Sequence, residues 1–546
     1  MKLGTQFDMD ETSEAQAVAH TLLEHQPQIP QRQDSKLIRT LRSCCIIPQR
    51  YIVGVMGLLG VCNAFTMRVC LNLAITQMVN HTKSDGYHES PDACPSDAID
   101  IVNTSAVHPD GYVSKPYGVF DWDEKTQGLI LSGFYYGYAL TQVLGGYLAE
   151  RFGGKWTLGV GLLSTALFTF LTPLVTRAGG ATWLFILRIL QGMGEGPTMP
   201  ALMIMLARWV PPHERSFQGA LVFGGAQIGN IFGSFISGVL LSGDNDWSYV
   251  FYFFGGFGLL WFCLWSLFCY STPNSHPFIS KKELQYLNTN VTTADNKGAK
   301  DPVPWKAILR SPPAWALVCA AVGHDWGYYT MITDLPKYST DVLKFNIKTT
   351  GTLTALPYIA MWLSSFLFGF ICDICVKKGW HTIKTGRIIH TTIAATGPAI
   401  CIILASYAGC DRVAAMVYFI LSMALMGGFY SGMKVNALDL APNYAGSLTS
   451  LVNTTSTFAG IVTPYLIGLL TPNSSLMEWR VVFWICFIAL VSTNVVYCIW
   501  ADGKQQWWDD VRQFGYPPEW KHGQLVPTES PDTVLELSQQ NGTTKQ

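Results

Sequence analysis

The chain has 546 residues, of which 49% are hydrophobic and only 13% are charged. Soluble domains carry about 25% charged residues, so this chain has too few charges to cover a large globular surface. The formal net charge is −1, from 36 Lys and Arg against 37 Asp and Glu, which leaves no long-range field to attract nucleic acid. We therefore expect a protein embedded in the lipid bilayer, with no nucleic-acid partner.

The cysteines and the known catalytic motifs indicate neither a metal site nor an enzyme. Most of the 14 cysteines lie inside apolar segments, where a thiol packs as a small hydrophobe. No set of C-x-x-C pairs with zinc-site spacing occurs, and the adjacent Cys44 and Cys45 have poor geometry for joint ligation. The sequence also has no Walker A loop, no nucleophile elbow and no H-E-x-x-H motif. We expect no metal, no cofactor and no ATP-driven or hydrolytic activity.

A series of long apolar segments follows a polar N-terminal stretch. Residues 1–49 lack an apolar region behind a basic start, so no cleavable signal peptide is expected. Each later segment has about 20 residues or more, enough for an α-helix to cross about 30 Å of hydrocarbon. The sequence therefore predicts an all-α integral membrane protein with twelve transmembrane helices in two six-helix bundles. The predicted spans are 50–79, 127–149, 156–176, 182–206, 217–241, 248–271, 313–334, 351–374, 387–408, 412–435, 445–470 and 480–501.

A hydrophilic stretch with several prolines separates the sixth span from the seventh and is interpreted as a linker. The segments GGYLAERFGGKW, after span two, and GFICDICVKKGW, after span eight, resemble each other. Their acids Glu150 and Asp373 each lie four residues after a glycine, and such parallel repeats are typical of transporter halves. The predicted organisation is a cytoplasmic tail at 1–49, a bundle at 50–271 with a long loop at 80–126, a cytoplasmic linker at 272–312, a bundle at 313–501 and a cytoplasmic tail at 502–546.

The distribution of charge predicts the orientation. Basic residues are concentrated before the first span and in the second-to-third, fourth-to-fifth and eighth-to-ninth loops, whereas the loop at 80–126 has nine acidic residues and three lysines. Because cytoplasmic loops carry the excess of Lys and Arg, both termini are expected in the cytoplasm. The loop at 80–126 also contains two glycosylation acceptors, Asn80 and Asn103, which are usable only on the lumenal or extracellular side.

Arg68 lies well inside the first predicted span, within NAFTMRVCLNLAITQMV. A charge near the bilayer centre is costly and needs a partner, a water-filled cavity or a function. A guanidinium can fork onto a carboxylate or a phosphate with two parallel hydrogen bonds. We therefore interpret Arg68 as a ligand for an anion in a cavity; an arginine snorkelling to the interface is the alternative.

The fourth span, LRILQGMGEGPTMPA, places Arg188 and Glu195 two helical turns apart on one face, with Gln191 between them. Two buried opposite charges offset each other's desolvation. We interpret Glu195 as a cation-coupling carboxylate held near a cationic partner, and a purely structural ion pair is the alternative. Pro197 and Pro200 interrupt the helix just beyond, as expected where backbone lines a cavity.

The seventh span, AVGHDWGYYTMITDLP, contains the adjacent residues His324 and Asp325. Neighbouring residues of a helix point in different directions, so one is expected to face the cavity and the other a neighbouring helix. A histidine titrates in the range that an acidic lumen would sample, which makes His324 a second candidate for cation coupling. A hydrogen-bonded packing histidine is the alternative.

These motifs, together with RWVPPHERS, ALPYIA and NALDLAPNYAG (436–446), resemble the major facilitator transporters and, within them, the anion:cation symporter branch. That branch includes sialin, the vesicular glutamate transporters and the type I sodium/phosphate cotransporters. The resemblance covers about residues 50–505 with the segments in order. It implies a two-bundle fold that transports by alternating access and is not an enzyme.

The resemblance also implies roles for individual residues. Arg68, Arg188, Tyr138 and Tyr329 correspond to residues that bind or line the substrate site, and Glu195 corresponds to the carboxylate linked to proton coupling. The loop after span two resembles the family's cytoplasmic gate. This implies gating roles for Glu150, Arg151 and, in the second half, Asp373.

Several positions depart from the patterns of the branch. The vesicular glutamate transporters have histidine where Leu131 stands and arginine where His324 stands, which argues against their type of glutamate transport. Sialin-like members carry glutamate and histidine at the positions of Gln191 and Met203, so proton coupling is expected to differ from theirs. Lys434, at the end of the tenth predicted span, is expected to be a further buried cation.

We therefore expect a symporter that moves small anions, organic carboxylates of the sialic acid or acidic amino acid type, together with protons or sodium. A sodium-dependent phosphate cotransporter is the alternative, and an anion channel whose arginines line a pore is a further one. The protein is expected to be a monomeric glycoprotein of the plasma membrane or of an endolysosomal or vesicle membrane.

Overall fold

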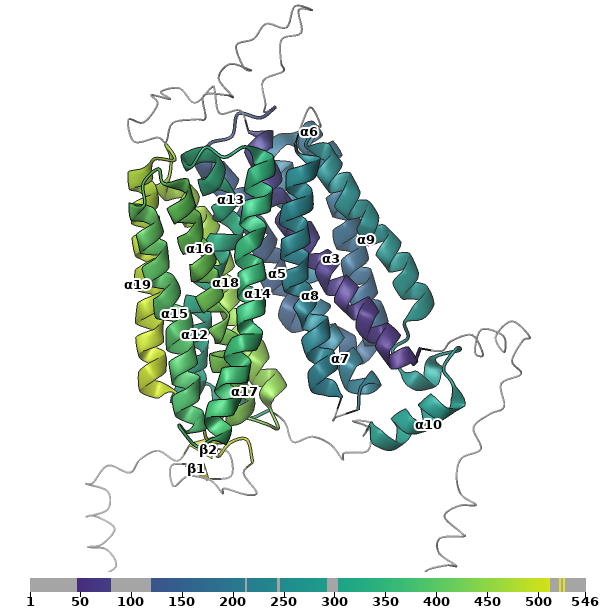
Figure 1. Cartoon of the computed structure of the whole chain (residues 1–546). Helices are drawn as coiled ribbons and strands as arrows, with labels where there is room; N and C mark the ends of the chain where they lie inside the picture. Colours follow the sequence, from purple (N-terminus) through teal and green to yellow (C-terminus); the bar gives the residue numbers. More distant parts are fainter. Residues whose placement is uncertain are drawn as a thin grey trace, which may run out of the picture.

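The computed structural model describes residues 47–79, 119–211, 214–242, 246–291, 303–510, 520–521 and 524–525. Helices make up nearly all of this part of the chain, and they stand side by side in two groups (Figure 1). A short antiparallel ladder of β1 (Trp520–Lys521) and β2 (Gln524–Leu525) lies beyond the last helix.

The first half of the chain supplies six crossings. The long helix α6 contains two of them, joined at Gly180, whose φ of 61° is a left-handed conformation that glycine adopts without strain. The fourth crossing is divided before Thr198, at Gly196 and Pro197, where the sequence predicts an interruption. The helices are α3 (Gln49–Met78), α5 (Glu124–Phe152), α6 (Gly154–Glu195), α7 (Thr198–Trp209), α8 (Arg215–Leu240) and α9 (Ser248–Phe268).

The second half supplies the other six crossings. Its seventh and tenth crossings contain π-helical turns, at Thr330–Asp334, Tyr338–Val342 and Tyr430–Lys434. Such turns insert an extra residue into an α-helix and are frequent at functional sites. The α-helices are α12 (Pro312–Tyr329), α13 (Leu335–Lys337), α14 (Ile347–Lys377), α15 (Ile383–Tyr407), α16 (Arg412–Met426), α17 (Val435–Leu440), α18 (Ala445–Leu470) and α19 (Leu476–Trp500).

Length and composition mark these helices as membrane-spanning. Among the described residues, 7 helical stretches are apolar enough to cross a membrane by themselves, and one of them, Gly154–Trp209, contains two crossings. The other four crossings, built on α5, α8, α12 and α18, are more polar but long enough. The seventh crossing continues to Val342, past the predicted end at residue 334, because Tyr338 packs against Trp479 and Phe483.

Each half has its own hydrophobic core, and a third cluster joins them. One cluster is built from buried residues of α3 to α10, such as Trp261 and Trp265, and another from the second half, such as Leu317 and Tyr497. The joining cluster combines Tyr135 and its neighbours on α5 with residues of the second half. The chain is therefore two six-helix bundles that share a central apolar contact.

Glycines let α8 pack closely on α3 inside the first bundle. A Cβ atom on Gly229 would lie 2.5 Å from the carbonyl oxygen of Cys62, and one on Gly225 would lie 2.6 Å from that of Leu58. Any larger residue would push the two helices apart. Small residues one turn apart are the usual means by which membrane helices approach each other.

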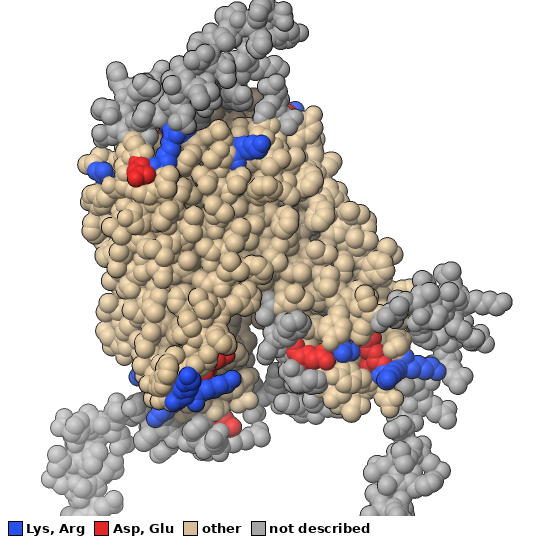
Figure 2. Space-filling model, viewed as in Figure 1, with Lys and Arg blue, Asp and Glu red and all other residues tan. Residues whose placement is uncertain are grey.

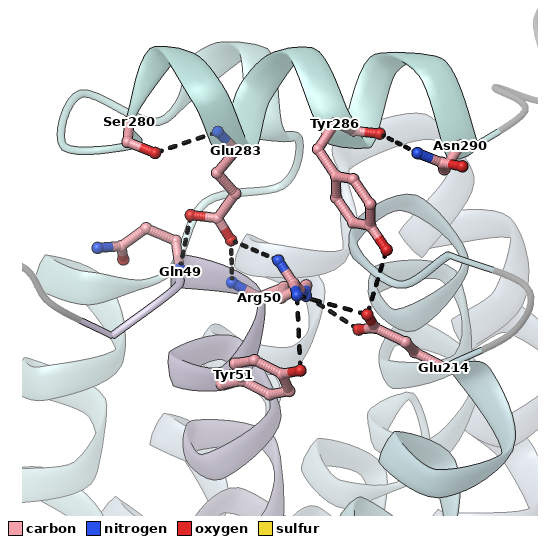
Figure 3. Close-up of polar contacts among 8 residues, drawn as sticks. All are labelled: Gln49, Arg50, Tyr51, Glu214, Ser280, Glu283, Tyr286 and Asn290. Carbon is pink, nitrogen blue, oxygen red and sulfur yellow. Dashed lines mark hydrogen bonds and ion pairs between the residues drawn. The ribbon is translucent and has the colours of Figure 1, made fainter.

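The linker helix α10 (Lys281–Asn290) is fastened to the start of α3 (Figure 3). The first N–H groups of a helix have no partner within it, and Pro48 at the N-cap of α3 offers no capping side chain. The carboxylate of Glu283 takes that role, because it accepts hydrogen bonds from the backbone N–H groups of Gln49 (2.9 Å) and Arg50 (3.1 Å). The Arg50 side chain in turn donates to Glu214 at the start of α8 (2.9 Å).

Replacing Glu283 by alanine should lower the free energy of unfolding by about 2 kcal/mol, because two N–H groups of α3 lose a charged acceptor. Glu283→Gln keeps an acceptor oxygen and should lose less. Thermal unfolding of the purified protein in detergent measures both. Gln285→Ala, on the exposed face of the same helix, is the control, and an equal loss in this variant would contradict the capping role.

Candidate functional site

A buried ion pair between two helices forms the centre of the site. Arg68 on α3 and Glu195 at the end of α6 are 5% and 1% exposed, and the Nη2 of Arg68 donates to the Oε1 of Glu195. The pair connects the first crossing with the fourth. Each charge offsets part of the desolvation of the other, which is the condition for burying either one.

Aromatic rings surround the guanidinium of Arg68. Its Cζ lies 4.4 Å from the ring centroid of Phe65, 4.8 Å from that of Phe134 and 4.9 Å from that of Tyr138. The negative faces of aromatic rings attract a cation, and the attraction is larger when the cation is desolvated. The rings therefore hold the arginine in place, and they add no negative charge to that of Glu195.

Arg188 lies beside this pair but does not join it. Its Nη1 donates to the Oε1 of Gln191 (3.2 Å) and its Nη2 to the backbone oxygen of Arg68 (3.5 Å). Within the described residues, no carboxylate lies within 4.0 Å of the Arg188 guanidinium. The sequence suggested Arg188 as the cationic partner of Glu195, but the bonded partner is Arg68, because α3 packs against the face of α6 that carries Glu195.

Three atoms of this cluster have no hydrogen-bond partner among the described residues. They are the Nε of Arg68, the Nε of Arg188 and the Oε2 of Glu195, and all three are buried. Buried polar groups are nearly always bonded, and each exception requires an explanation. The cluster therefore keeps two unused donors on cations and one unused acceptor on a carboxylate.

The predicted tyrosines lie next to the cluster, on both bundles. Tyr138 of α5 covers Arg68, and the ring of Tyr329 of α12 lies 4.7 Å from that of Tyr135 of α5. All three are buried. The structure thus brings Tyr138 and Tyr329 close to Arg68 at the junction of the two bundles.

His324 and Asp325 lie in different surroundings. The ring of His324 stacks on Phe429 with 3.6 Å between centroids and lines a small cavity inside the second bundle with Thr391 and Asn494. Asp325 remains 22% exposed and receives a hydrogen bond from the Nδ1 of His324 (3.1 Å). Asp325 is therefore the more exposed member of the pair.

The remaining predicted site residues lie elsewhere. Arg151 is exposed at the end of α5 and donates to the hydroxyl of Tyr147 (2.8 Å), and Asp373 is exposed near the end of α14. The side chain of Glu150 and the acceptors Asn80 and Asn103 lie outside the described residues. Among the described residues, no group of three or more His, Cys, Asp and Glu side chains could hold a metal ion.

Sequence reasoning missed an ion pair that joins the two bundles. Glu124, the first residue of α5, pairs with Lys337 of α13, and the lysine side chain is only 4% exposed. Nearby, a Cβ atom on Gly128 would meet the backbone of Pro464, and one on Gly238 would lie 2.8 Å from the Cα of Gly351. Close packing and this ion pair close the junction at the end where α5 begins.

The opposite end of the junction is open. Figure 2 shows a hollow between the two bundles at the end where Figure 1 places α7 and α17. Polar contacts between the bundles lie nearer the middle, where Asn230 donates to the hydroxyl of Tyr328 (2.7 Å) and Gln227 to that of Tyr430 (3.1 Å). The structure is therefore closed on one side of the charged cluster and hollowed on the other.

Comparison with known proteins agrees with this architecture. The family model of the Major Facilitator Superfamily matches residues 57–464. A Drosophila melanogaster protein named "Putative inorganic phosphate cotransporter" is 39% identical over 470 residues, covering 84% of this chain and 86% of its own. Sialin of Homo sapiens is 36% identical over 465 residues, which cover 85% of this chain and 91% of sialin. Vesicular glutamate transporter 2 of Homo sapiens is 32% identical over 474 residues, which cover 86% of this chain and 77% of that transporter.

Solved structures show the same fold. A bacterial homolog of the human lysosomal transporter Spinster, in an inward-facing and unoccupied conformation, superimposes with a TM-score of 0.62 at 14% identity. The superposition covers 83% of this chain and 97% of that one.

Removing either partner of the Glu124–Lys337 pair should destabilise the protein, because the other charge stays buried and unpaired. Glu124→Gln and Lys337→Met should each lower the melting temperature in detergent. The double variant Glu124→Gln/Lys337→Met should lose less than the sum, with a coupling of about 1–3 kcal/mol. Strictly additive losses would contradict a direct interaction.

Proposed function

The chain belongs to the Major Facilitator Superfamily of transporters, and from this membership we propose that it is a symporter for small organic anions. It is a transporter rather than an enzyme. The proposed cargo is a carboxylate of the sialic acid or acidic amino acid type, moved together with protons or sodium. Relatives named sialin and vesicular glutamate transporter support this class of cargo.

The observation that carries the proposal is the surplus of positive charge in the buried cluster. Arg68 and Arg188 supply two cations and Glu195 one carboxylate, a surplus of one positive charge if Glu195 is ionised. An uncompensated charge away from bulk water is costly, so a bound anion would stabilise the cluster. A guanidinium, with parallel N–H donors, suits a carboxylate.

The same geometry offers a means of coupling. Glu195 and an incoming anion compete for Arg68, because both are acceptors for its guanidinium. An anion that takes over Arg68 leaves Glu195 without its cation, and proton uptake then removes the cost of the unpaired carboxylate. Binding of the anion and of the proton would thus favour each other, as a symporter requires.

Alternating access follows from the arrangement of the bundles. The charged cluster lies near the junction, with the Glu124–Lys337 pair closing one end and a hollow at the other. Rocking of the bundles would break the first set of contacts and close the hollow. Such a motion exposes a central site to the two sides of the membrane in turn.

Charge and disulfide chemistry support the proposed orientation, with both termini in the cytoplasm. Cys410, in the turn between α15 and α16, is disulfide-bonded, and disulfides persist in oxidising compartments. Because successive crossings alternate in direction, that turn lies at the end of the molecule opposite to α10. The hollow would then open to the cytoplasm. We propose a monomer in the plasma membrane or in an endolysosomal or vesicle membrane.

Inorganic phosphate is a second candidate cargo. The relative from Drosophila melanogaster carries phosphate in its name, and guanidinium groups bind phosphate as well as carboxylate. An anion channel is less well supported, because described residues of the two bundles pack together and pair at the end where α5 begins.

Uptake into proteoliposomes tests the proposed function. Sialic acid, aspartate, glutamate and phosphate are each offered with an inward proton gradient, with a sodium gradient and with neither. We expect saturable uptake of at least one organic anion, driven by one of the gradients and accelerated by unlabelled anion on the other side. Uptake of phosphate alone would favour the second candidate, unitary currents would favour a channel, and no uptake at all would refute transport of these anions.

Arg68→Lys and Arg68→Ala should both reduce uptake at least about tenfold, because lysine keeps the charge but lacks the parallel N–H donors. Correct folding is checked by gel filtration and thermal unfolding. Arg412→Lys, at the start of α16 with its guanidinium over the ring of Phe345, is the control. Near-normal uptake in Arg68→Lys would show that a point charge is sufficient.

A further inference from the structure

A small cavity lies inside the second bundle, next to His324. Its wall is formed by residues of α12, α15 and α19 and by Phe429, which comes directly before the π-helical turn of the tenth crossing. The space open to the centre of a water-sized sphere is about 10 Å³, and about 10–15 Å³ by this measure holds one water molecule. The cavity therefore has the size of a single water and is too small for an organic anion.

Two buried polar atoms on the wall of this cavity have no hydrogen bond of normal geometry among the described residues. They are the Nε2 of His324 and the Oγ1 of Thr391, on residues that are 7% and 3% exposed. The third polar group nearby, the amide of Asn494, exchanges hydrogen bonds of 3.3 and 3.4 Å with Thr392. Buried polar atoms are nearly always bonded, and a buried water often supplies the bond. One water in the cavity would join the imidazole of His324 to the hydroxyl of Thr391.

The other ring nitrogen of His324 determines where a proton can bind. Its Nδ1 lies 3.1 Å from the Oδ1 of Asp325. An ionised carboxylate can only accept a hydrogen bond, so Nδ1 carries the hydrogen of the neutral ring. The lone pair is then on Nε2, on the side of the ring away from Asp325. After proton uptake at Nε2, both ring nitrogens would still have acceptors, namely the carboxylate and the water.

The direct neighbours of His324 compensate a positive charge on its ring. Asp325 supplies the opposite charge at hydrogen-bond distance, so the protonated pair is neutral overall and less costly to bury than a lone cation. Phe429 stacks on the imidazole with 3.6 Å between the ring centroids. The face of an aromatic ring attracts a cation. Both contacts therefore favour a ring that holds a proton.

The other titratable groups on the surrounding helices are bonded elsewhere. Besides Asp325, Lys434 of the tenth crossing is the charged group that acts on the imidazole, and its ammonium donates to Asn453 of α18 (2.8 Å). The helix α18 itself contains no charged residue. The remaining groups have these partners: His390 of α15 bonds to the backbone oxygen of Gly386, Arg387 to Asp439, Tyr497 of α19 to Asn436, and Cys498 to Thr392.

Contacts also connect His324 with the junction between the bundles. Its ring is nearly parallel to that of Tyr328, one turn later on α12, with 6.1 Å between the centroids. The hydroxyl of Tyr328 accepts the hydrogen bond from Asn230 of the first bundle (2.7 Å). A change of charge on His324 therefore occurs next to a residue that holds the two bundles together.

We propose that His324, Asp325 and one water molecule in the cavity form a proton-binding site in the second bundle. A proton binds to the lone pair of Nε2, which then donates to the water, and Asp325 balances the charge. The site is separate from Glu195, so each bundle has one group that takes up a proton. Its role in transport rests on the proposed function and makes the proton, rather than sodium, the coupling ion. Its capacity to bind a proton does not depend on transport.

NMR of protein labelled with ¹⁵N-histidine detects each ring nitrogen separately, and comparison with His324→Asn identifies the signals of His324. At high pH we expect a hydrogen on Nδ1 alone, and after titration between about pH 5 and 8 a hydrogen on both nitrogens. Asp325→Asn should remove this titration, because the buried imidazolium loses its counter-charge. A hydrogen on Nε2 at high pH, or no titration of His324, would overturn the proposal.

The water is tested by Thr391→Val, which keeps the shape of the side chain and removes the hydroxyl. The melting temperature in detergent should fall, because the water loses one of its hydrogen bonds. Thr463→Val is the matched control, since this hydroxyl is also buried and unpaired among the described residues but does not line the cavity. Its removal should not lower the melting temperature. An unchanged or higher melting temperature in Thr391→Val would indicate a dry cavity and refute the water site.

Uptake by the same preparations tests the coupling role. The ratio of uptake with an inward proton gradient to uptake without one should exceed one in the wild type and fall to about one in His324→Gln. His381→Gln, in the turn before α15, is the control and should keep the wild-type ratio. A wild-type ratio in His324→Gln would refute the role of His324 in coupling. Titration of His324 in a protein that takes up no anion would refute the proposed function and leave the proton site in place.

Discussion

The pairing of Arg68 with Glu195 is the interaction on which the rest of the site depends. A guanidinium and a carboxylate can be buried between α3 and α6 only because each offsets the desolvation of the other. Phe65, Phe134 and Tyr138 exclude water from the arginine without neutralising it. The pair is stable but incomplete, since one atom on each partner lacks a hydrogen bond. A site of this kind keeps its charges buried when no ligand is bound, and a bound ligand can still stabilise it further.

The junction between the bundles is suited to opening and closing. Within each bundle, close-packed glycines and large hydrophobic cores hold the helices together. Across the junction, the polar contacts of the described residues are single hydrogen bonds, such as Asn230 to Tyr328, and the ion pair of Glu124 with Lys337. A single hydrogen bond contributes only about 1 kcal/mol net. A modest binding free energy is therefore enough to exchange one set of contacts for another.

The cost of burying charge is enough to identify much of the site from the amino-acid sequence. Arg68, Arg188 and Glu195 stand out because they lie inside apolar spans, and the structure places them together. The same reasoning misses Glu124 and Lys337, because both lie at predicted helix ends, where an exposed charge costs little. Helical spacing also favours Arg188 as the partner of Glu195, because spacing compares only residues of the same helix. It does not predict which other helix packs against that one.

The sequence by itself determined the membrane class, the succession of twelve helices and the burial of Arg68, Arg188 and Glu195. These follow from local properties: the length of apolar runs, the spacing along a helix and the desolvation cost of each charged side chain. Only the tertiary structure decided that Arg68 is the partner of Glu195, that His324 stacks on Phe429, and that one end of the junction is closed. Those outcomes depend on how distant helices pack, and packing is decided by the shapes of all the contacting side chains together.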